Sequence, residues 1–142
     1  METINELEKY LEDECYSFNE ISIGKHYAYE GIIIKKIQEK YIFGYSERGN
    51  MDIIKSFEYE KDLVNYAFEA LSTDEWAKAH LVAWTWSEPE IINAEKELKD
   101  MDIKFKRNDI PNYSKNTTAY RIFVFGKDTL RLDSFRAKYF MK

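Results

Sequence analysis

Hydrophobic residues at the start of the chain recur every three or four positions. They are Ile4, Leu7, Leu11, Cys15 and Phe18. This spacing places all five side chains on one face of an amphipathic helix, opposite a mostly acidic face. Glu14 would interrupt the apolar stripe. We therefore expect a helix that begins near the N-terminus and ends before Glu14.

The period changes to two from about Tyr27. Residues 27–37, 41–47 and 51–57 alternate between apolar and polar positions and are rich in Ile, Tyr and Phe, which is typical of strands. Short segments of three residues separate them, and connections this short join antiparallel neighbours. The pattern predicts a three-stranded meander.

Helical spacing returns after the meander. Residues 60–71 carry apolar side chains on one face and polar side chains on the other. Ser72 and Glu75 have the spacing of a capping box, in which each side chain bonds to the backbone N–H of the other residue. We therefore expect a new helix over residues 74–86, apolar around most of its circumference and largely buried.

The rest of the chain mixes the two periods. Ser87 and Glu90 have the same capping spacing, which predicts a further helix. Strands are expected over residues 103–107 and 117–125, separated by a loop over residues 108–116. A last helical turn is expected near the C-terminus.

Together these elements predict an α+β fold in a single domain over residues 1–142. Its antiparallel sheet combines the three-stranded meander with about two C-terminal strands, and about four to five helices pack against it. The chain contains only 5 Gly and 2 Pro, which leaves little sequence for linkers or disorder. A chain of this length can bury a substantial core.

Charge is distributed unevenly, although the net charge is only −5. Residues 1–103 contain 11 Lys/Arg and 23 Asp/Glu, whereas residues 104–142 contain 10 Lys/Arg and 3 Asp/Glu. An acidic body with a basic terminal segment favours electrostatic recognition of a large charged partner. A homo-oligomer, in which the acidic part of one copy meets the basic part of another, is an alternative.

Motifs for catalysis, cofactors and metals are missing from the sequence. The two histidines, His26 and His80, are far apart, and neither has another His or Cys within four residues, as the usual zinc motifs require. The glycines are isolated, which excludes phosphate-binding and dinucleotide-binding loops. We therefore expect no metal, no cofactor and no enzymatic activity.

One spacing in the sequence leaves enzymatic activity as an alternative hypothesis. Trp76, His80 and Trp84 follow one another at intervals of four residues, and on a helix they would be neighbours on one face. His80 would then serve as a general acid or base in an aromatic pocket. A half-buried core histidine among aromatic side chains explains the same spacing.

The N-terminal segment lacks the basic and apolar regions of a secretion signal. The longest apolar run is no longer than a strand, well short of the ~20 residues that a membrane span needs. Cys15 is the only cysteine, so no intrachain disulfide can form. We expect a cytoplasmic protein with no membrane partner.

The basic segment interleaves Lys and Arg with aromatic residues over positions 104–138. Positive charge beside aromatic stacking surfaces is what single-stranded nucleic acid binding requires. The acidic charge of the whole chain would repel a polyanion at long range, which argues against nucleic acid as the partner. A nucleic-acid-binding module using residues 104–138 is therefore the alternative hypothesis.

The acidic body instead favours a basic protein as the partner. Toxic nucleases have positive surfaces where substrate phosphates dock, so a small acidic inhibitor associates quickly and competes for that surface. The candidate contacts, chosen on charge and position alone, are Glu12, Asp13, Glu58, Glu60 and Asp62.

Four stretches of the chain show a familiar hydrophobic spacing with a few identities. They are Tyr29-Glu-Gly-Ile-Ile-Ile, Tyr41-Ile-Phe-Gly-Tyr-Ser-Glu-Arg-Gly, Phe57 with Asp62-Leu-Val-Asn-Tyr-Ala-Phe, and Asp74-Glu-Trp-Ala-Lys-Ala-His. Together they resemble small immunity proteins of bacterial polymorphic toxin systems, such as those of contact-dependent growth inhibition. The resemblance implies a non-enzymatic cytosolic protein that binds and neutralises a cognate toxin domain. The resemblance does not indicate which residues of this chain bind the toxin.

Overall fold

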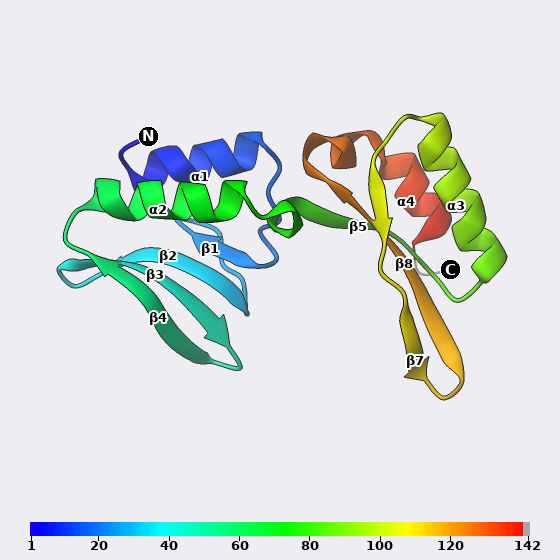
Figure 1. The fold of residues 1–142 in the computed structure, drawn as a ribbon, viewed down its shortest axis with the longest axis horizontal. Coiled ribbons are helices and arrows are strands. Elements are labelled where there is room, and N and C mark those ends of the chain that lie inside the picture. Colours follow the sequence, from blue (N-terminus) through cyan, green and yellow to red (C-terminus); the bar gives the residue numbers. More distant parts are fainter. Residues whose placement is uncertain (141–142) are drawn as a thin grey trace. The chain divides into compact units, whose positions relative to one another are not determined.

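The computed structural model describes residues 1–140 and confirms the predicted α+β class (Figure 1). The chain divides into two compact units, Met1–Lys78 and Ala79–Lys142. Each unit has a hydrophobic core of its own. The single domain expected over residues 1–142 stays a prediction, and the two units are described separately. Within residues 1–140, no helix is both long enough and apolar enough to cross a membrane.

The first unit contains a four-stranded sheet and two α-helices. Its elements are α1 (Ile4–Asp13), β1 (Ile21–Ile23), β2 (Gly31–Ile37), β3 (Lys40–Glu47), β4 (Asn50–Phe57), α2 (Glu60–Ser72) and the 3₁₀ helix η1 (Glu75–Lys78). The strand order is β1-β2-β3-β4. Strands β2, β3 and β4 form the predicted antiparallel meander, and β1, which was not predicted, pairs with β2 in parallel.

The two α-helices of this unit lie over one face of its sheet (Figure 1). Helix α1 begins with a capping box, in which the Thr3 hydroxyl accepts a hydrogen bond from the Glu6 N–H and the Glu6 carboxylate accepts one from the Thr3 N–H. It ends before Glu14, as predicted. The core of the unit consists of Leu7, Leu11, Tyr16, Ile21, Ile23, Ile34, Phe43, Leu63, Val64, Ala67 and Leu71. The apolar stripes of the two helices therefore cover the sheet.

The parallel pairing of β1 with β2 depends on Gly31. Its φ of +124° is a conformation that side chains rarely adopt. A Cβ atom at this position would lie 2.1 Å from the backbone oxygen of Glu20. Glycine therefore lets the two segments approach closely, and the N–H of Ile32 donates to the oxygen of Glu20 at 2.9 Å.

The second unit is built around its longest strand. Its elements are β5 (Ala79–Thr85), α3 (Glu88–Asp100), β6 (Phe105–Arg107), β7 (Ile110–Ser114), β8 (Thr117–Phe125), the 3₁₀ helix η2 (Gly126–Arg131) and α4 (Asp133–Tyr139). Strand β8 pairs antiparallel with β5, β6 and β7, and α3 and α4 pack on the sheet (Figure 1). The Ser87 hydroxyl accepts from the Glu90 N–H at 3.4 Å, which confirms the predicted helix start.

The prediction of a helix over residues 74–86 is wrong. Glu75–Lys78 form η1, and Ala79–Thr85 form β5. The helical spacing of apolar residues is real, but pairing with the distant β8 decides the conformation, because strand preference depends strongly on cross-strand contacts. Ser72 starts no helix: it is the last residue of α2, and its hydroxyl donates to the Glu69 carbonyl at 3.4 Å.

Two smaller expectations for the second unit also need correction. The loop expected over residues 108–116 contains β7, whose register with β8 is irregular. The strand expected over residues 103–107 is shorter and spans Phe105–Arg107. The strand over Thr117–Phe125 has the predicted bounds.

Replacing Gly31 with Ala is expected to lower the free energy of unfolding by about 3 kcal/mol or more, because the new Cβ collides with backbone. Gly49→Ala is the matched control, since Gly49 also has a positive φ (+80°) but no atom within 4 Å of a built Cβ. The free energy of unfolding of this control should fall by only about 1–2 kcal/mol. Urea unfolding of the two variants measures the difference, and equal losses would contradict the close approach at Gly31.

Candidate functional site

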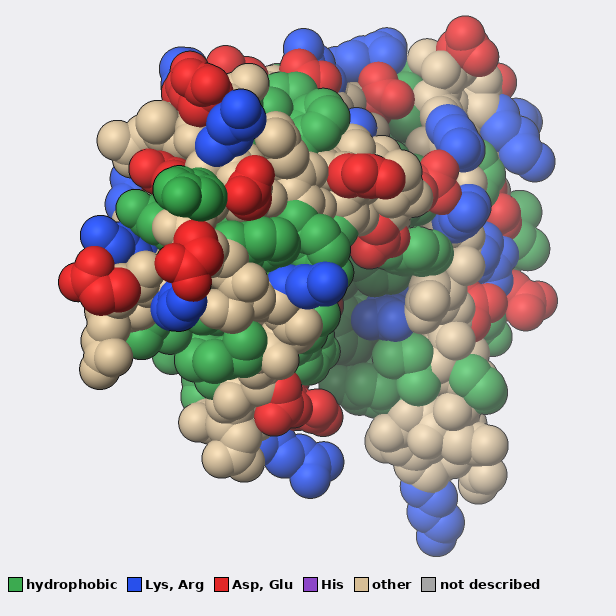
Figure 2. All heavy atoms as spheres, turned by 60° about the vertical axis from the view of Figure 1, so that its left-hand side comes forward, with side chains coloured by type: hydrophobic (Ala, Val, Ile, Leu, Met, Phe, Trp, Pro, Cys, Tyr) green, Lys and Arg blue, Asp and Glu red, His purple; other side chains and the backbone are tan. Residues whose placement is uncertain are grey.

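Carboxylates are spread over the surface of the first unit. Figure 2 shows acidic side chains between exposed hydrophobic ones on the face that is turned forward. Residues 1–78 contain 17 Asp/Glu and 9 Lys/Arg, a net charge of −8 with histidine counted as neutral. The acidic character noted in the sequence therefore belongs chiefly to this unit.

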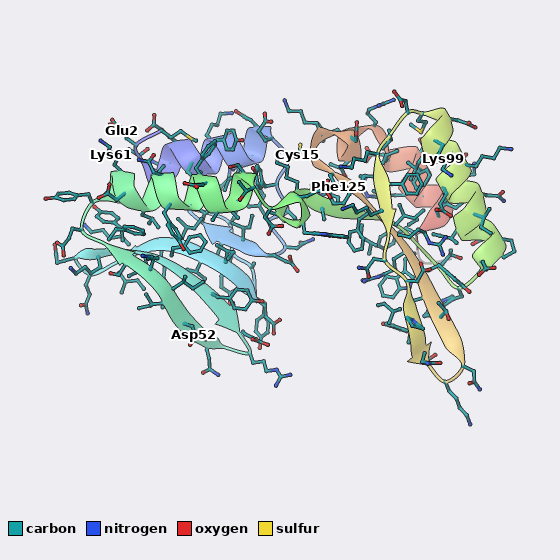
Figure 3. The ribbon with its side chains drawn as sticks, in the orientation of Figure 1. Glu2, Cys15, Asp52, Lys61, Lys99 and Phe125 are labelled. Carbon is teal, nitrogen blue, oxygen red and sulfur yellow. The ribbon has the colours of Figure 1, made fainter. Side chains whose placement is uncertain are left out.

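The five carboxylates predicted to contact a partner fall into two groups. They are Glu12 and Asp13 in the last turn of α1, and Glu58, Glu60 and Asp62 around the first turn of α2. The two helices run in the same direction, because Glu2 and Lys61 lie at one end of the pair and Cys15 lies at the other (Figure 3). The two groups therefore lie near opposite ends of α1. At a rise of ~1.5 Å per residue, the length of this helix separates them by roughly 13 Å. The structure does not bring the five together.

The carboxylates at the end of α1 have partners within the chain. The Oδ1 atom of Asp13 lies 2.8 Å from Nζ of Lys9. The Oε2 atom of Glu12 lies 2.7 Å from Nε2 of His26, and this hydrogen bond holds the pKa of Glu12 below its usual value. A partner that bound either carboxylate would compete with these contacts.

The group at the start of α2 is also largely engaged. Glu58 pairs with Lys40. The Oε2 atom of Glu60 accepts a hydrogen bond from the Ile4 N–H at 2.8 Å, so Glu60 joins the first turn of α2 to the first turn of α1. Asp62 is exposed. The role of all five as toxin contacts stays a prediction.

The first unit contains a more concentrated acidic site that the sequence did not indicate. It is a pocket of about 460 Å³. Its lining residues are Asn19, Glu20, Tyr29, Glu30, Gly31, Ile32, Tyr45 and Asp74. They come from the segment before β1, the residues just before β2 and its start, the second half of β3 and the turn after α2. Three of them are acidic, and none of the described residues that line the pocket is Lys or Arg.

The pocket combines negative charge with exposed aromatic rings. Glu30 and Asp74 each accept one backbone hydrogen bond, at 3.4 and 3.0 Å, which leaves acceptor capacity on both carboxylates. Tyr29 and Tyr45 are 67% and 40% exposed. Carboxylates and the faces of aromatic rings both attract guanidinium and ammonium groups. The pocket is therefore suited to a cationic side chain.

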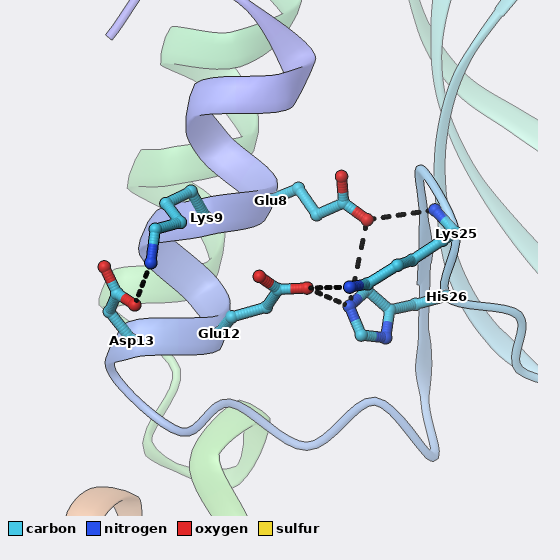
Figure 4. A network of polar contacts seen from close by, with 6 residues as sticks. All are labelled: Glu8, Lys9, Glu12, Asp13, Lys25 and His26. Carbon is cyan, nitrogen blue, oxygen red and sulfur yellow. Dashed lines mark hydrogen bonds and ion pairs between the residues drawn. The ribbon is translucent and has the colours of Figure 1, made fainter.

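A second constellation lies where α1 faces the turn after β1 (Figure 4). Glu8 and Glu12 project from α1, and His26 comes from the turn. One ligand atom from each residue lies within 4.8 Å of the other two. An imidazole nitrogen and two carboxylate oxygens are donors that bind first-row transition metals.

His80 does not occupy the helical position that its spacing suggested. It lies on β5, where it pairs with Val124 of β8. Trp76 belongs to η1 and Trp84 to β5. The expectation that these three side chains share one helix face is therefore wrong.

Much of the positive charge of the basic segment is paired with nearby acids. Arg107 donates to Asp109 at 2.6 Å and to Glu95 at 2.8 Å, and both contacts raise its pKa. Nζ of Lys138 lies 2.5 Å from Oε1 of Glu97. Residues 79–142 contain 12 Lys/Arg and 9 Asp/Glu, a net charge of only +3. The acids of α3 thus balance a segment that looks strongly basic in the sequence.

Sequence reasoning missed the acidic pocket because no local spacing indicates it. Glu20 and Glu30 come together through the pairing of β1 with β2, and Asp74 joins them from the end of α2. The alternation around Tyr29 and Tyr45 predicts strands and does not indicate a pocket. Comparison with protein-family models, with curated proteins and with solved structures found no match for this chain.

The Lys138–Glu97 contact predicts a dependence of stability on pH. The hydrogen bond from Lys138 lowers the pKa of Glu97 from its usual 4.5. A carboxyl whose pKa is lower in the folded state stabilises the fold above the unfolded value, and this contribution is lost as the pH falls through the folded value. Lys138→Met should therefore reduce the loss of stability between about pH 5 and about pH 3.

Urea unfolding of the parent chain and the variant across that range measures the effect. Lys99→Met, which removes an exposed lysine on α3, is the matched control and should behave like the parent chain. A pH dependence that is the same in all three proteins would contradict the contact.

Proposed function

We propose that this chain is an immunity protein that binds a cognate bacterial toxin domain in the cytoplasm and neutralises it without enzymatic activity. The observation that carries the proposal is the acidic pocket of the first unit. Six of its eight lining residues lie in the stretches that resemble immunity proteins: Tyr29, Glu30, Gly31, Ile32, Tyr45 and Asp74. The pocket therefore lies in the part of the chain that resembles immunity proteins.

The charge of the pocket fits the class of toxin proposed, a nuclease. A nuclease needs positive side chains where the phosphates of its substrate bind, and a protein carboxylate can pair with the same side chains. The net charge of −8 on the first unit would accelerate association with such a surface. An acidic inhibitor can therefore compete with nucleic acid for the same cations.

A toxin Arg or Lys side chain is the proposed occupant of the pocket. Its charged end would be held by Glu20, Glu30 and Asp74, and its flat or apolar part would lie against Tyr29 and Tyr45. An ion pair that is shielded from solvent by aromatic rings has the features of an interface hot spot. This contact would anchor the toxin while the surrounding surface excludes substrate.

Glu20→Gln/Glu30→Gln/Asp74→Asn is expected to weaken toxin binding by roughly thirtyfold or more, since truncating a desolvated charge pair costs about 2–5 kcal/mol. The amides keep the backbone hydrogen bonds of Glu30 and Asp74. Glu39→Gln/Glu47→Gln/Glu69→Gln removes the same charge from exposed positions outside the pocket.

Binding kinetics of the two variants with the purified toxin domain separate the effects. Both should associate more slowly, because both lose the same long-range attraction. Only the pocket variant should dissociate faster and fail to protect cells. Equal dissociation rates for both variants would overturn the pocket as the toxin anchor.

A nucleic-acid-binding module is the second candidate, and a cluster of aromatic rings in the second unit favours it. Trp84, Trp86 and Tyr113 have ring centroids 5.5–6.4 Å apart. Trp86 and Tyr113 are 43% and 48% exposed, so they offer stacking surfaces for bases. The paired charges of Arg107 and Lys138 place this candidate second.

A labelled single-stranded oligonucleotide tests the second candidate. Binding that weakens steeply with salt and drops in Trp86→Ala/Tyr113→Ala would favour it. Absence of binding at low salt would exclude it.

A further inference from the structure

The Glu8–Glu12–His26 cluster has the geometry of a metal site. Glu8 and Glu12 are four residues apart on α1, so their carboxylates project from the same face. Nε2 of His26 lies 2.7 Å from Oε2 of Glu12 and 3.8 Å from Oε2 of Glu8 (Figure 4). All three side chains therefore direct a donor atom into one small volume.

The two carboxylates of the cluster lie close together and are partly buried. The side chains of Glu8 and Glu12 are only 14% and 30% exposed, and both approach the His26 ring. Nζ of Lys25, on a side chain that is 77% exposed, lies 3.5 Å from Glu12. A divalent cation between the carboxylates would contact both of them and compensate for their burial.

The ligands are held in place by their surroundings. The His26 ring stacks on Phe18 with centroids 3.7 Å apart and planes 13° apart. The N–H of Lys25 donates to Oε2 of Glu8 at 2.9 Å. A Cβ at Gly24 would lie 2.4 Å from the Glu8 carboxylate, so any other residue at this position would displace that carboxylate. Such supporting contacts orient the ligands of metal sites.

We propose that Glu8, Glu12 and His26 bind one zinc ion that ties the turn after β1 to α1. Zinc takes imidazole nitrogen and carboxylate oxygen at about 2.0–2.2 Å, which sets tetrahedral ligand atoms roughly 3.3 Å apart. The separations of 2.7 and 3.8 Å lie on either side of that value. Magnesium and calcium prefer sites made entirely of oxygen. No motif in the sequence indicates this site, because His26 has no second His or Cys within four residues.

Zinc titration of the chelator-treated full chain tests the proposal. Calorimetry should find one ion per chain, and saturating zinc should raise the Tm by at least ~4 °C. Millimolar magnesium should produce neither result. The measurement needs no toxin, so its outcome is independent of the proposed immunity function.

The two histidines of the chain give a matched pair of variants. His26→Gln should weaken zinc binding by at least about tenfold, and His80→Gln should leave it unchanged. Glu8→Gln should also weaken it by at least about tenfold, and it provides the test if His26→Gln does not fold. Circular dichroism without metal verifies the fold of each variant. Zinc binding that is absent, or equal in Glu8→Gln, His26→Gln and His80→Gln, would overturn the proposal.

Discussion

The parallel pairing of β1 with β2 is the constraint on which both sites of the first unit depend. Parallel neighbours normally need a long crossover connection, yet here residues 24–30 join two strands in the register Ile21↔Ile32. The chain must therefore reverse its direction twice in a few residues. The first reversal carries His26 to Glu8 and Glu12, and the second, at Gly31, places Glu30 beside Glu20 in the acidic pocket.

Electrostatics distinguish the two units in a way that the linear charge pattern obscures. The boundary between acidic and basic sequence lies near residue 103, inside the second unit. There, α3 supplies Glu95 and Glu97 to Arg107 and Lys138. Because the acids of this unit lower its net charge to +3, the net charge of −8 on the first unit is the larger electrostatic feature. The proposed function follows from that unit.

Local patterns predicted much of the fold and little of the candidate sites. The apolar spacing near the N-terminus, the capping signal at Ser87 and the alternation of the meander are local patterns, so α1, α3 and the three strands could be predicted. Residues 79–85 were misassigned because their apolar spacing fits a helix, whereas pairing with β8 decides the conformation. The pocket and the Glu–Glu–His cluster join residues distant in the chain, and only tertiary contacts bring them together.

The proposed function requires that the acidic first unit binds a basic toxin domain. Its most direct test is to capture the tagged chain from a nuclease-treated lysate of its native host, wash it at high salt and identify what remains bound by mass spectrometry. The expected result is a stoichiometric protein that carries a basic, toxin-like C-terminal domain and whose toxicity the chain suppresses. If no protein partner is recovered, and nucleic acid is bound only when the nuclease is omitted, the immunity function is wrong and nucleic acid binding by the aromatic cluster of the second unit is favoured.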